Sequence, residues 1–331
     1  MKRRVFSLAS VLVAFLVFVG AARSASAAEA ERPAELRIGY QKIGALLILK
    51  EQGLLDKRLA GQGVTVKWVQ FQSGPPLIEA LNAGAIDFGY VGDTPPIFAQ
   101  ASAVKFVYVA SIPQPGKSSA ILVRSDSGIK TLSDLRGKKI ALVKGSSAHN
   151  VLLQALAKAN IPLSEISPVF LQPADAGAAI QSGAVDAWSI WDPFYAVGER
   201  YPGVRVLTNA EGIAPSNAFF LASRDYATRY PATVQVVIDE AKNAWHWAQG
   251  HQDELAQVLA NASGVDLSAE KVVAARTNYE VFYLSSHVVR QQQAIADTFS
   301  KLGLIPHAIQ VNEVVWTPNG KALSASSSAQ R

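Results

Sequence analysis

The chain contains one phrase twice: residues 83–95 read AGAIDFGYVGDTP, and residues 182–194 read SGAVDAWSIWDPF. Each copy runs through Gly-Ala, a branched aliphatic residue and an aspartate, then through an apolar stretch to a second aspartate. The offset, 182 − 83 = 99 residues, is much longer than the period of about 20–50 residues found in solenoid repeats. The duplication therefore predicts two similar half-domains.

Strand-like and helix-like segments alternate around each copy. Near the first copy, residues 35–40, 64–71 and 105–112 have the composition of strands, whereas residues 44–60 and 75–84 have the spacing of helices. A second block of the same kind surrounds the second copy, and the chain beyond it is mainly helical. This alternation predicts an α/β fold in which parallel sheets are covered by helices.

Two soft segments interrupt the alternation, near residues 113–118 and 210–217, and both are rich in Pro, Gly or small residues. We interpret them as two chain crossings between two lobes. Lobe I then comprises residues 34–113 plus 217–317, and lobe II is an insertion formed by residues 114–216. Binding proteins that close a cleft by hinge motion are built in this way.

The N-terminus has the pattern of an export signal. Basic residues at positions 2–4 precede an apolar run at 11–22 and a small-residue cleavage site at 25–27. We predict that residues 1–27 are a signal peptide and that the mature protein resides in the periplasm. The chain has no cysteine, which excludes a lipid-attached lipoprotein, disulfides and thiol catalysis. Residues 318–331 are small and polar, and we predict that they are disordered.

The charge of the chain comes mostly from this leader. The full sequence has 31 Lys and Arg against 26 Asp and Glu. Residues 1–27 hold four of the bases and no acid, so the mature chain has 31 − 4 = 27 bases and 26 acids. A net charge of about +1 gives no electrostatic support to nucleic-acid binding.

Two predicted strand-to-helix turns are rich in hydrogen-bond donors. One contains Gly92, Asp93 and Thr94, and the other contains Ser146 and Ser147. Open α/β sheets bind ligands where strands end and helices begin, and free N–H groups at helix N-termini favour anions. The same residues also suit helix capping alone, and the sequence leaves that alternative open.

The remaining polar and aromatic residues of these turns have simpler interpretations. Asp87 and Asp186 lie early in their strands, and we expect them to be structural. Trp188 suits the core, whereas Trp191, at the end of its strand, is the better candidate for a cavity wall. We expect His149 to lie in the first helical turn with a neutral imidazole, because a helix N-terminus disfavours positive charge.

Catalytic patterns are weak in this sequence. Its five histidines lack metal-binding spacing, and KGSSAHN at 144–150 is neither a nucleophile elbow nor a phosphate-binding P-loop. We therefore expect no enzyme activity, no metal and no cofactor.

Five motifs together resemble a known family: LRIGYQKIGAL (36–46), GDTPPIFAQA (92–101), KGSSAHNVLLQAL (144–156), DAWSIWDPF (186–194) and VVWTP (314–318). They are similar to the periplasmic aliphatic-sulfonate-binding proteins of ABC importers, whose broader relatives bind taurine, nitrate or bicarbonate. The resemblance implies a type II periplasmic binding protein fold, two α/β lobes with a hinged cleft and two chain crossings. It also implies two partners, an inner-membrane permease and its cytoplasmic ATPase.

The resemblance implies a set of ligand-binding residues in the cleft between the lobes. By position in the motifs these are Gln41, Lys42, Gly92, Asp93, Thr94, Ser119, Ser146, Ser147, His149, Trp191 and Asp192. Thr94 occupies a position at which relatives vary.

These observations predict a monomeric, non-catalytic receptor that captures a small organic sulfonate and delivers it to the permease for sulfur acquisition. The same role with taurine, nitrate or bicarbonate is the nearest alternative. Two alternatives come from other classes: an enzyme built on the same fold, and a ligand sensor for a membrane kinase.

Overall fold

The computed structural model describes residues 31–114 and 116–317 of the 331-residue chain. The predicted signal peptide, 1–27, and the predicted disordered tail, 318–331, lie outside the described residues. The described residues from Arg32 onward belong to one compact unit. Within the described part, no helix is long and apolar enough to cross a membrane.

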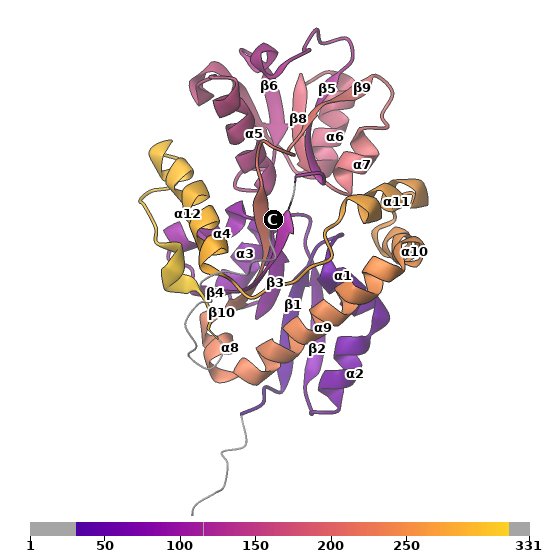
Figure 1. Cartoon of the computed structure of the whole chain (residues 1–331), viewed down its shortest axis with the longest axis vertical. Coiled ribbons are helices and arrows are strands. Elements are labelled where there is room, and N and C mark those ends of the chain that lie inside the picture. The colour runs from indigo at the N-terminus through magenta and orange to yellow at the C-terminus, as the bar shows by residue number, and fades with distance from the viewer. Residues whose placement is uncertain (1–30, 115, 318–331) are drawn as a thin grey trace, which may run out of the picture. The chain divides into compact units, whose positions relative to one another are not determined.

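Two five-stranded sheets organise this unit, and they share one plan (Figure 1). The first sheet has the order β2-β1-β3-β10-β4 and the second has the order β7-β6-β8-β5-β9. The strands of the first sheet are β1 (Glu35–Tyr40), β2 (Thr65–Gln70), β3 (Phe88–Val91), β4 (Phe106–Gln114) and β10 (Ser216–Ser223). The strands of the second sheet are β5 (Ser119–Arg124), β6 (Lys139–Leu142), β7 (Ser167–Phe170), β8 (Ala187–Trp191) and β9 (Val204–Asn209).

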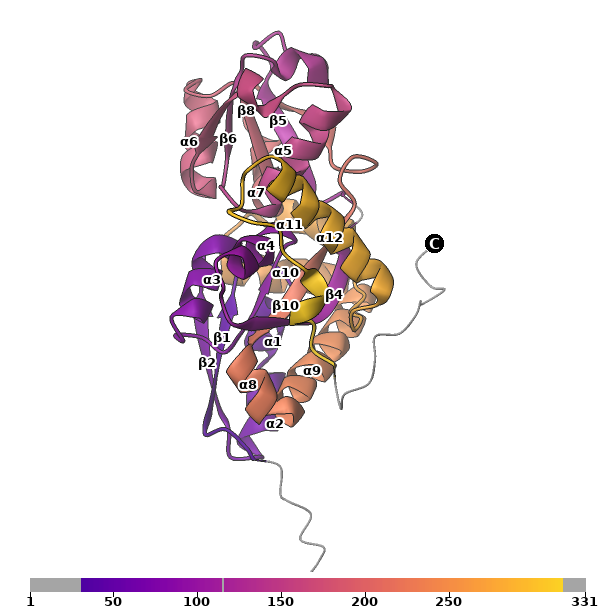
Figure 2. The same cartoon turned by 90° about the vertical axis from the view of Figure 1, so that its left-hand side faces the viewer.

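Helices cover both faces of each sheet, and Figure 2 shows α5 and α6 on opposite sides of the second sheet. The helices before β10 are α1 (Ala45–Gln52), α2 (Leu54–Ala60), α3 (Gly74–Asn82), α4 (Thr94–Ala101), α5 (Ser147–Lys158), α6 (Pro173–Ser182) and α7 (Phe194–Gly198). Those after it are α8 (Arg224–Arg229), α9 (Pro231–Gly250), α10 (Gln252–Ser263), α11 (Leu267–Arg276) and α12 (Ser286–Lys301).

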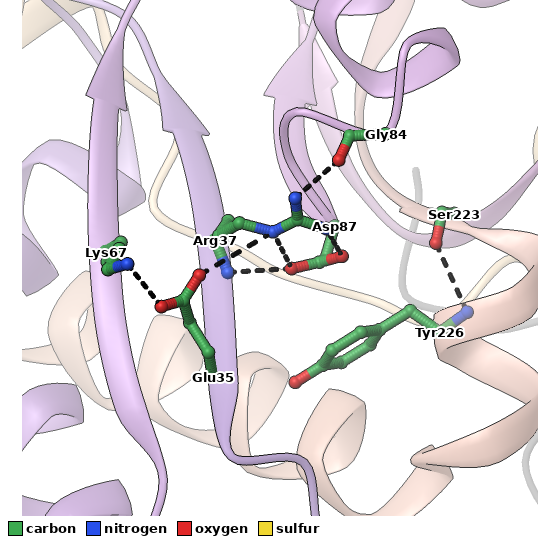
Figure 3. A network of polar contacts seen from close by, with 7 residues as sticks. All are labelled: Glu35, Arg37, Lys67, Gly84, Asp87, Ser223 and Tyr226. Carbon is green, nitrogen blue, oxygen red and sulfur yellow. Dashed lines mark hydrogen bonds and ion pairs between the residues drawn. The ribbon is translucent and has the colours of Figure 1, made fainter.

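The duplicated phrase occupies equivalent places in the two sheets, because it forms β3 in one and β8 in the other. Asp87 accepts a hydrogen bond from the backbone N–H of Arg37 on β1 at 2.9 Å and pairs with the Arg37 guanidinium (Figure 3). Asp186 likewise accepts from the backbone N–H of Lys139 on β6, at 2.8 Å. Each aspartate holds the neighbouring strand, which confirms the expectation that both are structural.

The prediction of purely parallel sheets is wrong in one respect. β1 pairs in parallel with β2 and β3, and β6 pairs in parallel with β7 and β8. β10, however, is antiparallel to both of its neighbours, and so is β5. These two strands each follow a crossing from the other sheet, and they enter their sheet in the opposite direction.

Both predicted crossings are confirmed. The first leads from β4 in the first sheet to β5 in the second, and the other leads from β9 back to β10. The described chain thus places the second sheet as an insertion between strands of the first. The exact lobe boundaries stay a prediction.

The single helix predicted for residues 44–60 is two helices. Gly53 ends α1 in the left-handed conformation, with φ 61°, and its N–H donates to the carbonyls of Leu49 and Lys50. α2 then starts at Leu54. Glycine adopts this conformation without steric cost and commonly ends helices, so the break has a local cause that helical periodicity does not reveal.

Apolar side chains form separate clusters on the faces of the sheets. Trp188 on β8 is 1% exposed and packs with Ile180 and Tyr195 on one face of the second sheet. Leu152 of α5 belongs to the cluster on the other face. The core therefore fixes β8, from whose end the turn at Trp191 extends.

Candidate functional site

A cavity lies between the two sheets, where the strands of both sheets end. It includes about 750 Å³ of unfilled space, part of it open to solvent. Seven of the eleven predicted binding residues line it: Gln41, Gly92, Ser119, Ser146, Ser147, Trp191 and Asp192. The structure thus brings together turns from both copies of the repeat.

Gly92 and Ser147 meet across the cavity. A Cβ atom added to Gly92 would overlap Ser147 Oγ and lie 3.1 Å from Ser147 Cβ. Gly92 directly follows β3 of the first sheet, whereas Ser147 is the first residue of α5, which packs against the second sheet. The absence of a side chain at Gly92 therefore permits the close approach of the two walls.

Asp93 is a buried junction between helices. It is 1% exposed, and its carboxylate accepts hydrogen bonds from Thr94 Oγ1 at 2.9 Å and from Asn150 Nδ2 at 2.7 Å. Its carbonyl accepts from Gln292 Nε2 at 2.6 Å. Burial raises the pKa of Asp93, and hydrogen bonds from Asn150, Thr94 and Ser147 oppose that effect. Asp93 joins α4, α5 and α12, and it is not part of the cavity lining.

The lining supplies neutral hydrogen-bond donors. The N–H groups of Ser147 and Ala148 at the start of α5 have no acceptor within the helix, whereas the His149 N–H donates to Ser146 O at 2.9 Å. Ser119 contributes a hydroxyl group, while the Ser146 hydroxyl donates to Val143 O at 2.7 Å and the Ser147 hydroxyl bonds to Asp93. Among the described residues of the lining, none is lysine or arginine. Dipoles and hydroxyls rather than full positive charges are therefore available to an anion.

Trp191 and Asp192 form the wall contributed by the second copy of the repeat. Trp191 is half-buried and lies edge-on to Phe194, with ring centroids 6.2 Å apart. The Asp192 side chain is 0% exposed, and its Oδ1 accepts from the Ala196 N–H at 3.0 Å and lies 3.4 Å from Arg276 Nη1. Burial raises the pKa of Asp192 to about 7, against the lowering effect of Arg276.

Comparison with known proteins places this architecture in a family. Residues 52–266 match the family described as "ABC transporter, phosphonate, periplasmic substrate-binding protein". The chain belongs to the periplasmic substrate-binding proteins of ABC transporters.

Individual members of this family are similar to the chain over most of its length. A protein of Escherichia coli (strain K12) that carries the name aliphatic sulfonates-binding protein is 39% identical over 292 residues, 86% of this chain and 90% of that protein. Its namesake in Bacillus subtilis (strain 168) is 32% identical over 308 residues, 92% of this chain and 93% of the relative.

A solved structure of the family agrees with the fold. The alkanesulfonate-binding protein SsuA from Xanthomonas axonopodis pv. citri, bound to MOPS, has a TM-score of 0.83 and 42% identity. The match covers 87% of this chain and 99% of SsuA. The predicted α/β fold of the periplasmic binding proteins is confirmed by this similarity together with the two sheets and their crossings.

Four predicted residues of this substrate-binding protein do not line the cavity: Lys42, Asp93, Thr94 and His149. Lys42 Nζ donates to Ser263 O at 2.5 Å, which directs it toward α10. The Thr94 hydroxyl is taken up by Asp93, as described above. Their roles in binding stay predictions, and the contacts assign each of them a supporting position.

His149 lies behind the cavity in a buried aromatic contact. Its ring lies edge-on to Phe170 and Phe299, with centroids 6.1 and 5.2 Å away. Burial, together with Lys144, lowers the pKa of His149 to about 4. The imidazole is therefore neutral near pH 7, and it packs α5 against α12.

Several lining residues of this substrate-binding protein were missed by the sequence reasoning. They are Ile43, Gly74, Tyr90, Pro95, Gln114, Gly116, Ser118, Val151, Ala210, Ala214, Ser216, Asn217 and Ala218. Asn217 and Ser118 lie in the segments identified as crossings, so a search of those segments for polar side chains would have found them. In the described part of the chain, no group of three or more His, Asp or Glu side chains is placed to hold a metal ion.

Proposed function

We propose that this protein captures an aliphatic sulfonate in the cavity between its two sheets and delivers it to an inner-membrane ABC permease. The observation that carries the proposal is a cavity in which neutral donors from both sheets lie beside the aromatic ring of Trp191. A sulfonate has three acceptor oxygens and a permanent charge, which neutral N–H and hydroxyl donors match without a change of protonation. The binding of MOPS by the similar SsuA protein supports the proposal.

The aromatic wall favours an organic anion over a bare one. Trp191 is half-buried beside the cavity and offers apolar area to a carbon chain. Nitrate and bicarbonate have no such chain and would leave this area unused. The proposal extends to export by the predicted leader, a monomeric state, a cytoplasmic ATPase that drives the permease, and the absence of enzyme activity.

Calorimetry of the mature protein with a panel of anions tests the proposal. We expect MOPS or a short alkanesulfonate such as ethanesulfonate to bind at micromolar strength, about −8 kcal/mol. We expect sulfate, nitrate and bicarbonate to bind at least about 30-fold more weakly, a difference of about 2 kcal/mol. Tight binding of nitrate or bicarbonate, with no binding of any sulfonate or of taurine, would refute it.

The serine hydroxyls are expected to differ in their effect on affinity. Ser119→Ala removes a lining hydroxyl, and a hydrogen bond to a charged group contributes about 1.5–3 kcal/mol. We therefore expect sulfonate affinity to fall at least about tenfold, as measured by calorimetry. Ser146→Ala serves as the matched comparison, because its hydroxyl already donates to Val143 O, and we expect a change within about threefold. A larger effect at Ser146 than at Ser119 would show that the hydroxyls are assigned wrongly.

A further inference from the structure

We infer that Arg276, the last residue of α11, is a positioning residue that holds the two walls of the cavity together around the ligand. The inference deepens the proposed function and rests on it for the ligand. It does not follow from the repeat, because α11 lies in the helical region beyond both copies. Three sets of contacts carry it.

The first set fixes α11 to the wall formed by the first sheet. Lys42, next to the lining residue Gln41, donates to Ser263 O at the end of α10 at 2.5 Å. Ser263 Oγ in turn donates to Glu270 Oε1 on α11 at 2.8 Å. Ile43, another lining residue, packs against the apolar cluster of α11. Polar and apolar contacts therefore join α11 to the turn that follows β1.

The second set joins α11 to the wall formed by the second sheet. Arg276 Nη2 donates to both carboxylate oxygens of Glu199, at 2.8 and 2.9 Å, and Nη1 lies 3.4 Å from Asp192 Oδ1. The guanidinium carbon lies 4.0 Å from the centroid of the Tyr195 ring. Ala196 of α7 packs into the same apolar cluster as α11. One arginine thus bridges two carboxylates and an aromatic ring of the opposite wall.

The third set connects Arg276 to the cavity itself. Asp192 directly follows Trp191, and its backbone N–H donates to Ser118 O at 2.9 Å; all three residues line the cavity. Asp192 Oδ2 is buried and has no hydrogen-bond partner among the described residues. A buried carboxylate without a nearby cation is costly, so the arginine is the group that stabilises this wall in its present position.

Contacts on the other flank of the cavity are independent of Arg276. In Figure 1, α7 and α11 lie at the right of the molecule, and α4 and α5 lie at the left. On the side of α4 and α5, Asn150 donates to Asp93. Loss of Arg276 is therefore expected to free one flank and leave the other joined. The walls then part more readily, and a bound sulfonate escapes faster.

Distance measurement between two labels tests this directly, since the chain has no native cysteine. Lys57→Cys on α2 and Lys158→Cys on α5, both exposed, place one label beside each sheet. In the ligand-free protein, we expect Arg276→Gln to shift the distance distribution toward longer values. Arg276→Lys is expected to give an intermediate shift, because lysine keeps the charge but not the fork geometry.

Stopped-flow measurement with MOPS gives the second readout. We expect Arg276→Gln to raise the dissociation rate at least about tenfold and to change the association rate less than about threefold. The control is Arg124→Gln, which removes an exposed pair with Asp126 at the end of a single strand; it is expected to leave both readouts unchanged. An unchanged distance distribution together with an unchanged dissociation rate in Arg276→Gln would overturn the inference. Failure of the wild-type protein to bind any sulfonate would overturn the proposed function instead, and the label distances would still decide the role of Arg276.

Discussion

Gly92→Val is expected to weaken sulfonate binding at least about 100-fold, which corresponds to about 2.7 kcal/mol. The added side chain would occupy the space now filled by Ser147 at the start of α5. The smaller change Gly92→Ala is expected to have a lesser effect, because the Ser147 hydroxyl can rotate away at the loss of its contact with Asp93. Calorimetry of the two variants and of wild type measures the three sulfonate affinities.

The fold is expected to tolerate the same change. Within 4 Å of the added Cβ, the described atoms belong to Ser147 on the opposite wall, so parting of the walls relieves the overlap. We therefore expect the free energy of unfolding to change by less than about 1 kcal/mol. Gly250→Ala is the control, because a Cβ atom there would meet nothing within 4 Å. Wild-type affinity in Gly92→Val would mean that the two walls do not need to approach each other for binding.

Asp192→Asn is expected to change the pH dependence of stability. Burial raises the pKa of Asp192 from 3.8 to about 7 in the folded protein. In wild type, the stabilising contribution of this group is therefore full below pH about 4 and is lost as the pH rises through about 7. The contribution of Asp192 to the free energy of unfolding therefore falls by about 4 kcal/mol over this pH range, because each pKa unit is about 1.4 kcal/mol.

Asparagine has no proton to lose in this range, so the free energy of unfolding of the variant relative to wild type is expected to rise by about 4 kcal/mol between pH 4 and pH 8. Urea unfolding at a series of pH values measures it. The charged groups that face Asp192 are Arg276, Glu199 and Glu270, and all three are retained in the variant. The control is Asp225→Asn, which replaces an exposed carboxyl on α8. A difference between Asp192→Asn and wild type that does not vary with pH would contradict the prediction.

The repeat made the paired architecture predictable because each copy plays the same part in its own sheet. Asp87 and Asp186 each bond to a backbone N–H of the neighbouring strand, so each copy carries the information for its own sheet. The apolar stretch after each aspartate forms a buried strand for the same reason. The turns at Gly92 and Trp191 then follow from the positions where those strands end.

Contacts between distant segments were not predictable in this way. Arg276 reaches Asp192 over 84 residues of sequence, and Lys42 reaches Ser263 over 221. The local sequence around an arginine at a helix end does not indicate which carboxylate it will contact. The contact of Lys42 with Ser263 could not be predicted for the same reason, because a turn fixes where a side chain starts and the packing of later helices fixes where it ends.

The neutral lining of the cavity has a consequence for the release of a bound anion. An anion held by a lysine or arginine would keep a full ionic partner on one wall after the walls separate. Here, within the described lining, the donors are dipoles and hydroxyls that come from both sheets. Each wall by itself holds only part of the set, so parting the walls dismantles the binding site. Release of a bound anion then requires separation of the two walls and no change in the charge of the protein.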